Sequence, residues 1–196
     1  MSTPTVPIHR PLRADAARNR ARVLEAARAA FAEHGAEAQI EDIARRAHVG
    51  VGTVYRHFPT KQALAEALVE ERFERVLAHA RGLLDEPDPW HAIERSFEFC
   101  ATTQEGDRAW AGVLATLAGG GPVAPPCEHQ LAELLGITER MLARAQAAGL
   151  VREDLRAADM PPLYCGLASV VQAGVADWRR YLELLLAGLR ASSPPA

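Results

Sequence analysis

The sequence has few of the features that mark a secreted or membrane-spanning protein. Its three cysteines, Cys100, Cys127 and Cys165, are odd in number and far apart, so they predict no disulfide framework. The first residues, MSTPTVPIHRPLR, hold no apolar core of the kind that a signal peptide needs, and no run of about 18 apolar residues could span a membrane. We therefore expect a cytoplasmic protein that makes no contact with a membrane.

Catalytic motifs are also missing. None of the GxSxG, HExxH, CxxC or P-loop patterns occurs. The glycine-rich segment 119–126 is followed by no GK[ST], so a connector is a better interpretation than a phosphate loop. Cys127, Glu128 and His129 are consecutive, which would point them in different directions at a helix start, and no fourth ligand accompanies them. We expect no enzyme activity, no cofactor and no metal site.

Aromatic residues and lysine are scarce. Aromatics make up 6% of the chain while alanine is abundant, which favours helices over sheets, and 48% hydrophobic residues can fill a core. Residues 1–61 hold ten basic against six acidic residues, whereas residues 62–196 hold twelve against nineteen. The composition therefore predicts an all-α protein whose N-terminal end is positive, and a positive end favours binding to phosphates.

Residues 40–61 are the most informative segment, because they read as two short helices joined by a tight turn. Their apolar positions recur at helical spacing and are Ile40, Ile43, Ala44 and Ala47 in the first helix and Val49, Val54 and Phe58 in the second. The outward positions of the second helix carry side chains that can bind phosphates or base edges, namely Thr53, Tyr55, Arg56 and His57. This arrangement is how a protein places a helix in the major groove of DNA.

The residues that follow predict how the second helix ends and the next begins. Pro59 stops the helix because it has no backbone N–H to donate, and Thr60 can cap the next one. Lys61, the only lysine of the chain, then lies in a first turn, where a cation is unfavourable unless it and the helix end share an anion. A solvated surface lysine is the alternative, but the preceding pattern favours a phosphate contact.

The segment GVGTVYRHFPTKQAL resembles the signature of the TetR (tetracycline-repressor-type) family of transcriptional regulators, and the similarity extends back through VLEAARAAFAEHG and IEDIARRAHV, covering roughly residues 18–68. The resemblance implies an N-terminal three-helix helix-turn-helix DNA-binding domain and a larger helical domain for effector binding and dimerisation. It places DNA-facing positions at Gln39, Glu41, Val51, Gly52, Thr53, Tyr55, Arg56, His57 and Lys61.

Several positions depart from the common pattern of that family. Gln39 replaces a hydroxyl residue and Gly50 replaces a serine cap. His48 replaces a turn glycine and can adopt a left-handed conformation only at some cost. Glu41 would face phosphate unfavourably if it pointed at DNA. These departures keep the helix-turn-helix but leave the operator sequence unpredicted.

Three segments are expected. Residues 1–17 form a disordered arm, in which Arg10 and Arg13, followed by Arg18, either track DNA or serve only to solubilise the chain. Residues 18–71 form the DNA-binding domain, whose first helix ends at Gly35, and residues 72–196 form the ligand-binding and dimerisation domain. The apolar spacing predicts a long helix from Lys61 to the DEPDP break and shorter helices near 90–100, 110–117, 128–148, 159–174 and 177–190. Asp159 is expected to cap the helix near 159–174, with Pro161 and Pro162 in its first turn.

The last two helices carry more apolar surface than a monomer requires, which predicts a homodimer held by a four-helix bundle. The expected interface residues are Leu163, Leu167, Val170, Trp178, Tyr181, Leu182, Leu185 and Leu189. Ordinary core packing is the alternative for about half of them. By analogy with the family, a pocket for a hydrophobic or aromatic effector is expected among Trp90, Phe97, Cys100, Gln104, Trp110, Leu114, Leu117, His129, Met141 and Tyr164, each of which also suits a core.

Together these features predict a dimeric transcriptional repressor that a small molecule releases from a palindromic double-stranded DNA operator. The alternative is an effector-independent dimeric DNA-binding protein that acts through protein contacts.

Overall fold

The computed structural model describes residues 10–104, 128–174 and 177–191. Every regular element in these ranges is a helix, apart from one isolated bridge between Val151 and Arg190, so the predicted all-α class is confirmed. The chain falls into two compact units that divide between Glu70 and Glu71. None of the described helices combines the length and the apolarity that crossing a bilayer requires.

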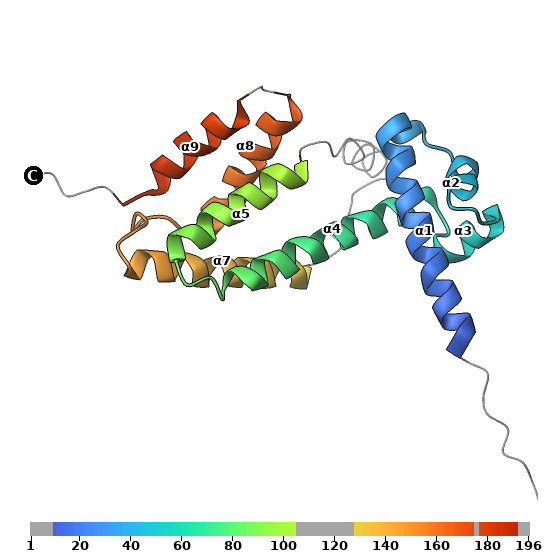
Figure 1. Cartoon of the computed structure of the whole chain (residues 1–196), viewed down its shortest axis with the longest axis horizontal. Helices are drawn as coiled ribbons and strands as arrows, with labels where there is room; N and C mark the ends of the chain where they lie inside the picture. The colour runs from blue at the N-terminus through green and yellow to red at the C-terminus, as the bar shows by residue number, and fades with distance from the viewer. Residues whose placement is uncertain (1–9, 105–127, 175–176, 192–196) are drawn as a thin grey trace, which may run out of the picture. The chain divides into compact units, whose positions relative to one another are not determined.

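The first unit is built on three helices and the beginning of a fourth (Figure 1). They are α1 (Arg10–His34), a 3-10 turn η1 (Gly35–Glu37), α2 (Ile40–Arg46), α3 (Val51–His57) and the first part of α4 (Lys61–Leu83). One apolar side chain or more from each α-helix is fully buried, and Phe31, Ile43, Val54 and Leu64 lie at the centre of the core. The regularly spaced apolar residues of segment 40–58 therefore lie on the faces of α2 and α3 that pack into this core.

Local signals end these helices where the sequence predicts. Gly35 adopts a φ of +56° directly after α1, which a glycine does without strain. His48 adopts a φ of +52° in the turn before α3, as the replacement of the usual glycine requires. Thr60 caps α4, because its Oγ1 accepts the backbone N–H of Ala63 at 3.0 Å.

The start of α1 differs from the sequence prediction. The helix begins at Arg10, whereas a disordered arm was expected over residues 1–17 and a helix only from about Arg18. The prolines that suggested an arm end at Pro11, where a missing N–H costs a first turn little. Alanine and arginine dominate residues 13–22, and both favour a helix. Residues 1–9 lie outside the described part of the chain.

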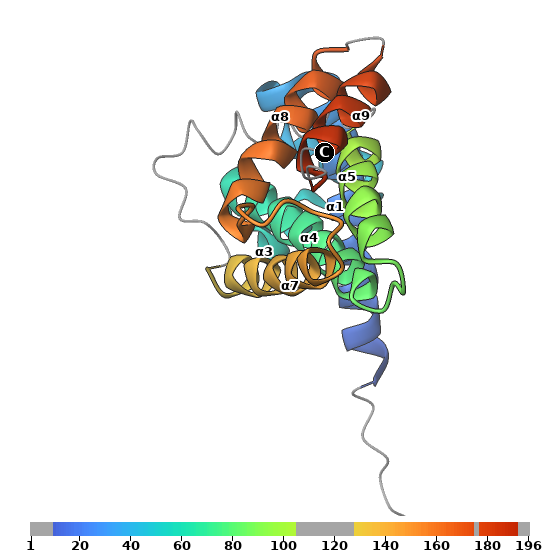
Figure 2. The ribbon, with the colours of Figure 1, turned by 90° about the vertical axis from the view of Figure 1, so that its left-hand side faces the viewer.

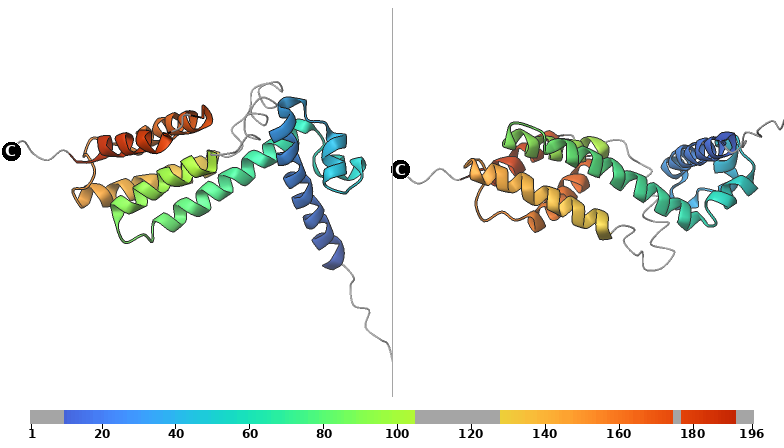
Figure 3. Two further views of the ribbon diagram at one scale, coloured as in Figure 1. Left: turned by 45° about the horizontal axis from the view of Figure 1, so that its top comes forward. Right: turned by 90° about the horizontal axis from the view of Figure 1, so that it is seen from below.

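The second unit contains the rest of α4, α5 (Pro89–Gln104), α7 (Glu128–Ala147), the 3-10 turn η2 (Ala157–Asp159), α8 (Met160–Gln172) and α9 (Trp178–Leu189). Helix α5 packs against both α7 and α8, and α9 packs on α8 (Figures 2 and 3). Ile93, Phe97, Ile137 and Leu167 are fully buried in the resulting core. The helix expected near residues 110–117 lies outside the described residues.

The ends of the helices in the second unit follow the predicted signals with one exception. Gly149 has a φ of +67° after α7, and Asp177 accepts the backbone N–H of Arg180 at 3.0 Å to cap α9. Pro161 and Pro162 lie in the first turn of α8, as predicted. The side chain of Asp159, however, does not cap α8, because its carboxylate accepts the backbone N–H of Arg156 at 2.9 Å.

Candidate nucleic-acid interface

Helix α3 presents a narrow exposed stripe. Gly52, Tyr55 and Arg56 are exposed at a spacing that aligns them on one side of the helix, and the side chain of Tyr55 is 45% exposed. Val54 and Phe58 face the core with at most 3% exposure. A Cβ added at Gly52 would meet no atom within 4 Å, so the backbone there is open to close approach. The helix is therefore anchored on one side and available on the other.

The side chain of Arg56 makes no hydrogen bond or ion pair with any other described residue. Its guanidinium therefore keeps its donors for an external partner, and the two edges of a guanine or a phosphate are partners that it fits.

The remaining expected contacts on α3 are less open. Val51, Thr53 and His57 are half-buried, and the Nε2 atom of His57 is buried without a hydrogen-bond partner among the described residues. The ring of His57 lies beside that of Phe58, with 6.2 Å between centroids. His57 thus lies at the edge of the exposed stripe.

Lys61 already has partners within the first unit. Its ammonium donates to the backbone carbonyl of Ala36 and lies 5.9 Å from the centroid of the Phe31 ring. The first turn of α4 is thereby joined to the segment between α1 and α2. An ammonium has three N–H donors, so a phosphate contact by Lys61 stays a prediction.

Gln39 and Glu41 lie at the start of α2. Gln39 occupies the N-cap position without capping the helix, and its side-chain amide donates to the Glu37 carbonyl at 2.9 Å. Glu41 is exposed in the first turn, where the helix dipole favours a carboxylate. Both residues thus have a local structural role beside the predicted contact with DNA.

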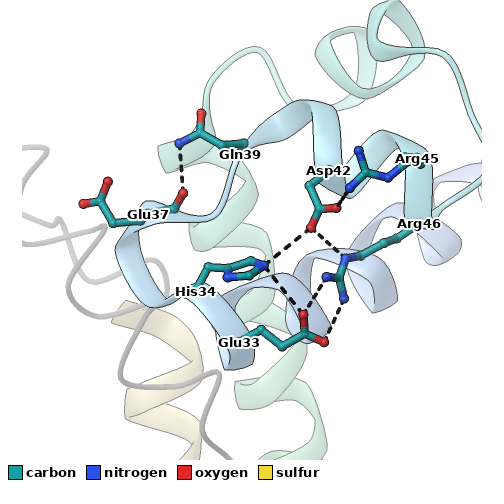
Figure 4. Close-up of polar contacts among 7 residues, drawn as sticks. All are labelled: Glu33, His34, Glu37, Gln39, Asp42, Arg45 and Arg46. Carbon is teal, nitrogen blue, oxygen red and sulfur yellow. Dashed lines mark hydrogen bonds and ion pairs between the residues drawn. The ribbon is translucent and has the colours of Figure 1, made fainter.

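An ion-pair cluster fixes α2 to the end of α1 (Figure 4). The guanidinium of Arg46 donates to both carboxylate oxygens of Glu33, at 2.9 and 2.6 Å, and its Nε donates to Asp42 at 2.7 Å. Arg45 also pairs with Asp42, and the imidazole of His34 lies 3.6 Å from Glu33 and 4.0 Å from Asp42. Hydrogen bonding to Arg46 lowers the pKa of Glu33 and, in return, raises the pKa of Arg46.

Sequence reasoning missed this cluster. The spacing of Asp42 and Arg46 within one helix was readable, since residues four apart lie side by side. The contact between Arg46 and Glu33 could not be predicted, because the two residues lie 13 positions apart on different helices. The cluster holds α2, and with it the turn into α3, in a defined orientation to α1.

In the second unit, three of the residues expected around an effector lie together. The Tyr164 hydroxyl is 2.8 Å from Ser96 Oγ, the Tyr164 and Phe97 rings are 4.5 Å apart, and the Cys100 thiol donates to the Tyr164 carbonyl at 3.7 Å. Burial raises the pKa of Tyr164 to about 12 and the pKa of Cys100 to about 11, so both stay neutral near neutral pH. Ser96, which no sequence pattern marked as a site residue, completes this polar group.

The other expected effector residues lie elsewhere. Trp90 is buried, and its Nε1–H donates to the carboxylate of Glu94. The guanidinium of Arg190 lies 3.7 Å from the centroid of the Trp90 ring, so Trp90 holds the end of α9 against α5. Met141 lies in the core, and His129 is exposed. Gln104 accepts a hydrogen bond from Gln172 at 3.1 Å. Trp110, Leu114 and Leu117 lie outside the described residues.

The residues expected at a dimer interface divide into two groups. Leu167, Trp178, Leu182 and Leu189 are buried in the core of their own unit, whereas Leu163, Val170, Tyr181 and Leu185 are partly or fully exposed. Leu184, which the sequence analysis did not single out, is 57% exposed. A depression of about 430 Å³ lies beside it, with Leu155, Leu163, Leu185 and Leu189 in its wall and Arg152, Asp154 and Asp159 in its polar part.

Comparison with known proteins gives two family matches. Residues 23–68 match the family described as "Bacterial regulatory proteins, tetR family", and residues 88–191 match "Transcriptional regulator SbtR-like, C-terminal domain". A TetR transcription regulatory protein of Mycobacterium vanbaalenii has a similar structure, with 41% identity, a TM-score of 0.69, and coverage of 92% of this chain and 99% of that one. The crystal structure of a gamma-butyrolactone receptor (ArpA-like protein) is 26% identical, with a TM-score of 0.63 and coverage of 90% of each chain.

Among curated relatives, the A-factor receptor protein of Streptomyces griseus is 30% identical over 134 residues, which are 66% of this chain. The chain spans less than half the length of the curated relatives that it matches first, since the aligned region is 45% of the A-factor receptor and 36% of the regulator UidR of Escherichia coli. The two family matches cover most of the chain, and the named relatives regulate transcription or act as receptors. The chain belongs to the TetR family of DNA-binding transcriptional regulators.

Proposed function

We propose that this chain is a homodimeric repressor that binds a palindromic operator and is released from it by a largely apolar small molecule. The observation that carries the proposal is the exposed stripe of α3, where the side chain of Arg56 has no partner among the described residues while Val54 and Phe58 anchor the opposite side in the core. A free guanidinium at this position suits bidentate recognition of a guanine edge.

Arg56→Ala should weaken binding to a selected operator by about 1–3 kcal/mol and relax the preference at one base pair of each half-site. Arg140→Ala is the matched control, because Arg140 is an exposed arginine of α7. Binding would be measured by fluorescence anisotropy with a labelled operator. Wild-type affinity and wild-type base preference in the Arg56 variant would contradict this assignment of α3.

The dimer is proposed to form over the apolar surface of α8 and α9. Leu184 and Tyr181 are exposed there, and the depression next to Leu184 has leucine walls that suit an apolar side chain of a second copy. Leu184→Glu should produce monomers that stay folded, because a charge at the centre of such an interface would be buried without a partner. Leu182 is buried in its own core, so a charge at that position tests folding instead.

Leu131→Glu provides the matched control, since Leu131 is also an exposed leucine, 42% exposed, but on α7. Analytical ultracentrifugation at micromolar concentration should find dimers for the wild type and for Leu131→Glu, and monomers for Leu184→Glu. A monomeric wild type, or a dimeric Leu184 variant, would contradict the proposed interface.

The effector is proposed to enter the apolar core of the second unit and to bind beside Phe97, Cys100 and Tyr164. The hydroxyl pair of Ser96 and Tyr164 offers one polar group in apolar surroundings, which is the composition that small-molecule sites favour. Two relatives support a small-molecule response, because their names call them an A-factor receptor and a gamma-butyrolactone receptor.

Helix α4 is a continuous element from the DNA-binding end to the second unit, so a shift of this helix is the proposed route to the α3 helices of the dimer. To lower DNA affinity 100-fold, the effector must prefer the released state by about 2.7 kcal/mol, and operator DNA must weaken effector binding by the same factor. Screening apolar and aromatic compounds for release of a labelled operator tests the proposal. If none releases it, the effector-independent regulator is the better account.

A further inference from the structure

The positive charge of the N-terminal end is concentrated before the helix-turn-helix. Residues 23–61 hold five basic and five acidic residues and are therefore neutral. Residues 10–22, the first half of α1, hold five arginines and one aspartate. Residues 23–61, which include the recognition helix, therefore carry no net charge that would attract DNA, whereas the first half of α1 carries a net positive charge.

The basic residues of the neutral part are mostly engaged within the protein. Arg45 and Arg46 pair with carboxylates, and Lys61 donates to the Ala36 carbonyl. Arg28 also has an interaction within the described structure. Arg56 remains as the cation of this part that has no partner among the described residues.

Residues 14–22 of α1 place no buried side chain in the core. From Ala14 on, where side-chain burial is described, Val23 is the first buried residue of α1, and residues 14–22 are exposed except for Asn19, which is half-buried. In Figures 1 and 3 this part of α1 extends beyond the other helices of the first unit. Burial of apolar surface therefore does not explain why residues 14–22, about 14 Å of helix, are helical.

Two arginines place this helix beside α3. The guanidinium of Arg22 donates to the carbonyl of His48, in the turn before α3, at 3.2 Å. The guanidinium of Arg20 lies 5.4 Å from the ring centroid of Phe58, directly after α3. Both side chains are exposed, so cations of α1 lie next to each end of the recognition helix.

We propose that the first half of α1, residues 10–22, is a second DNA-binding surface that contacts the phosphate backbone next to the half-site read by α3. Arg20 and Arg22 lie next to the two ends of α3, so a duplex that holds α3 in its major groove would have backbone phosphates near them. A length of about 20 Å of duplex carries about 12 phosphates. A guanidinium group can bind two phosphate oxygens at once. Asp15, the one acidic residue of this segment, pairs with Arg18 and offsets one of its five positive charges. The inference rests on the proposed function of DNA binding and adds the source of its electrostatic part.

The test uses full-length chains and a selected operator. The variant Arg10→Gln/Arg13→Gln/Arg18→Gln removes three charges of this helix and keeps Arg20 and Arg22, the two arginines that lie against the ends of α3. The matched control, Arg75→Gln/Arg140→Gln/Arg156→Gln, removes three exposed charges of the second unit. Dissociation constants would be measured by anisotropy between 0.05 and 0.3 M salt, and thermal unfolding would be recorded for each protein.

Each phosphate contact contributes about 0.9 to the slope of log affinity against log salt. In a dimer, the loss of three to six contacts should flatten the slope by about 3 to 5 units and lower affinity at least about 100-fold at 0.15 M salt, with an unchanged melting temperature. The control variant should keep the wild-type slope.

Three results would overturn the proposal. A wild-type slope in the α1 variant would mean that this helix does not touch DNA. A tighter complex in that variant would mean that the arginines bind an acidic protein surface instead. A wild type that enriches no sequence from a DNA pool would overturn the proposed function itself, which distinguishes the two failures.

Discussion

The hydroxyl groups of Ser96 on α5 and Tyr164 on α8 are hydrogen-bonded, and removing one of them should cost more stability than removing the other. Ser96 Oγ lies 2.7 Å from the Ile93 carbonyl and 2.8 Å from the Tyr164 hydroxyl. A carbonyl only accepts, so the serine proton goes to Ile93 and the tyrosine proton goes to the serine oxygen. Ser96→Ala therefore leaves the hydroxyl donor of a half-buried tyrosine without its partner, whereas Tyr164→Phe leaves the serine with its bond to Ile93.

The magnitudes follow from that difference. Leaving a buried polar group unsatisfied costs about 1–3 kcal/mol, whereas the net loss of one hydrogen bond costs about 0.5–1.5 kcal/mol. We expect Ser96→Ala to be the more destabilising change. The double variant should be about as stable as Tyr164→Phe alone, because it leaves no orphaned donor, and the magnitude of the coupling free energy should therefore equal the cost of Ser96→Ala, about 1–3 kcal/mol.

Urea unfolding followed by circular dichroism measures these free energies. Ser169→Ala is the matched control, because Ser169 Oγ also donates to a carbonyl of its own helix, that of Cys165 at 2.9 Å, but is exposed. The control corrects for the higher helix propensity of alanine. If the two single changes cost the same and their effects added, the assigned direction of the hydrogen bond would be wrong.

Three further predictions concern pH, the turn and Lys61. Burial raises the pKa of Tyr164 to about 12 and of Cys100 to about 11, above their unfolded values, so the free energy of unfolding should fall as pH rises from about 9 to 12. Tyr164→Phe should reduce that fall by up to about 2.7 kcal/mol in pH-dependent urea unfolding, and an unchanged pH dependence would mean that the hydroxyl is not buried. His48→Gly should raise stability by about 0.5–1 kcal/mol, because glycine adopts the positive φ without strain, and a lower melting temperature would show that the imidazole is needed. Lys61→Met should flatten the salt dependence of operator binding by about one unit per half-site, whereas an unchanged slope with reduced stability would assign Lys61 to the Ala36 contact alone.

Local signals made much of the fold predictable. The apolar spacing of residues 40–58 identified the buried faces of α2 and α3, and Gly35 and Gly149 marked helix ends that the structure confirms. The start of α1 was missed because the prolines of residues 1–11 were taken to represent the whole segment before Arg18. The role of Asp159 was missed because its carboxylate could bond either the next helix or the Arg156 N–H.

The sites were less predictable, because their partners come from distant parts of the chain. The stripe of Tyr55 and Arg56 follows from helical geometry alone. The contact between Trp90 and Arg190 could not be predicted in this way, because it joins the beginning of α5 to the end of α9. Trp90, which was expected near an effector, therefore packs against the end of α9 instead. Leu184 was overlooked because one leucine among several on α9 cannot be ranked by spacing; its exposure distinguishes it.

Selection of bound sequences from a random DNA pool tests the central claim most directly. Two α3 helices related by two-fold symmetry must enter major grooves on one side of the duplex, roughly 34–36 Å or a multiple of this apart. The account predicts an enriched palindrome whose half-sites are about one helical turn, or a whole number of turns, apart, and whose enrichment is lost with Arg56→Ala. A wild-type protein that enriches no sequence, or only an asymmetric site bound by a monomer, would contradict it.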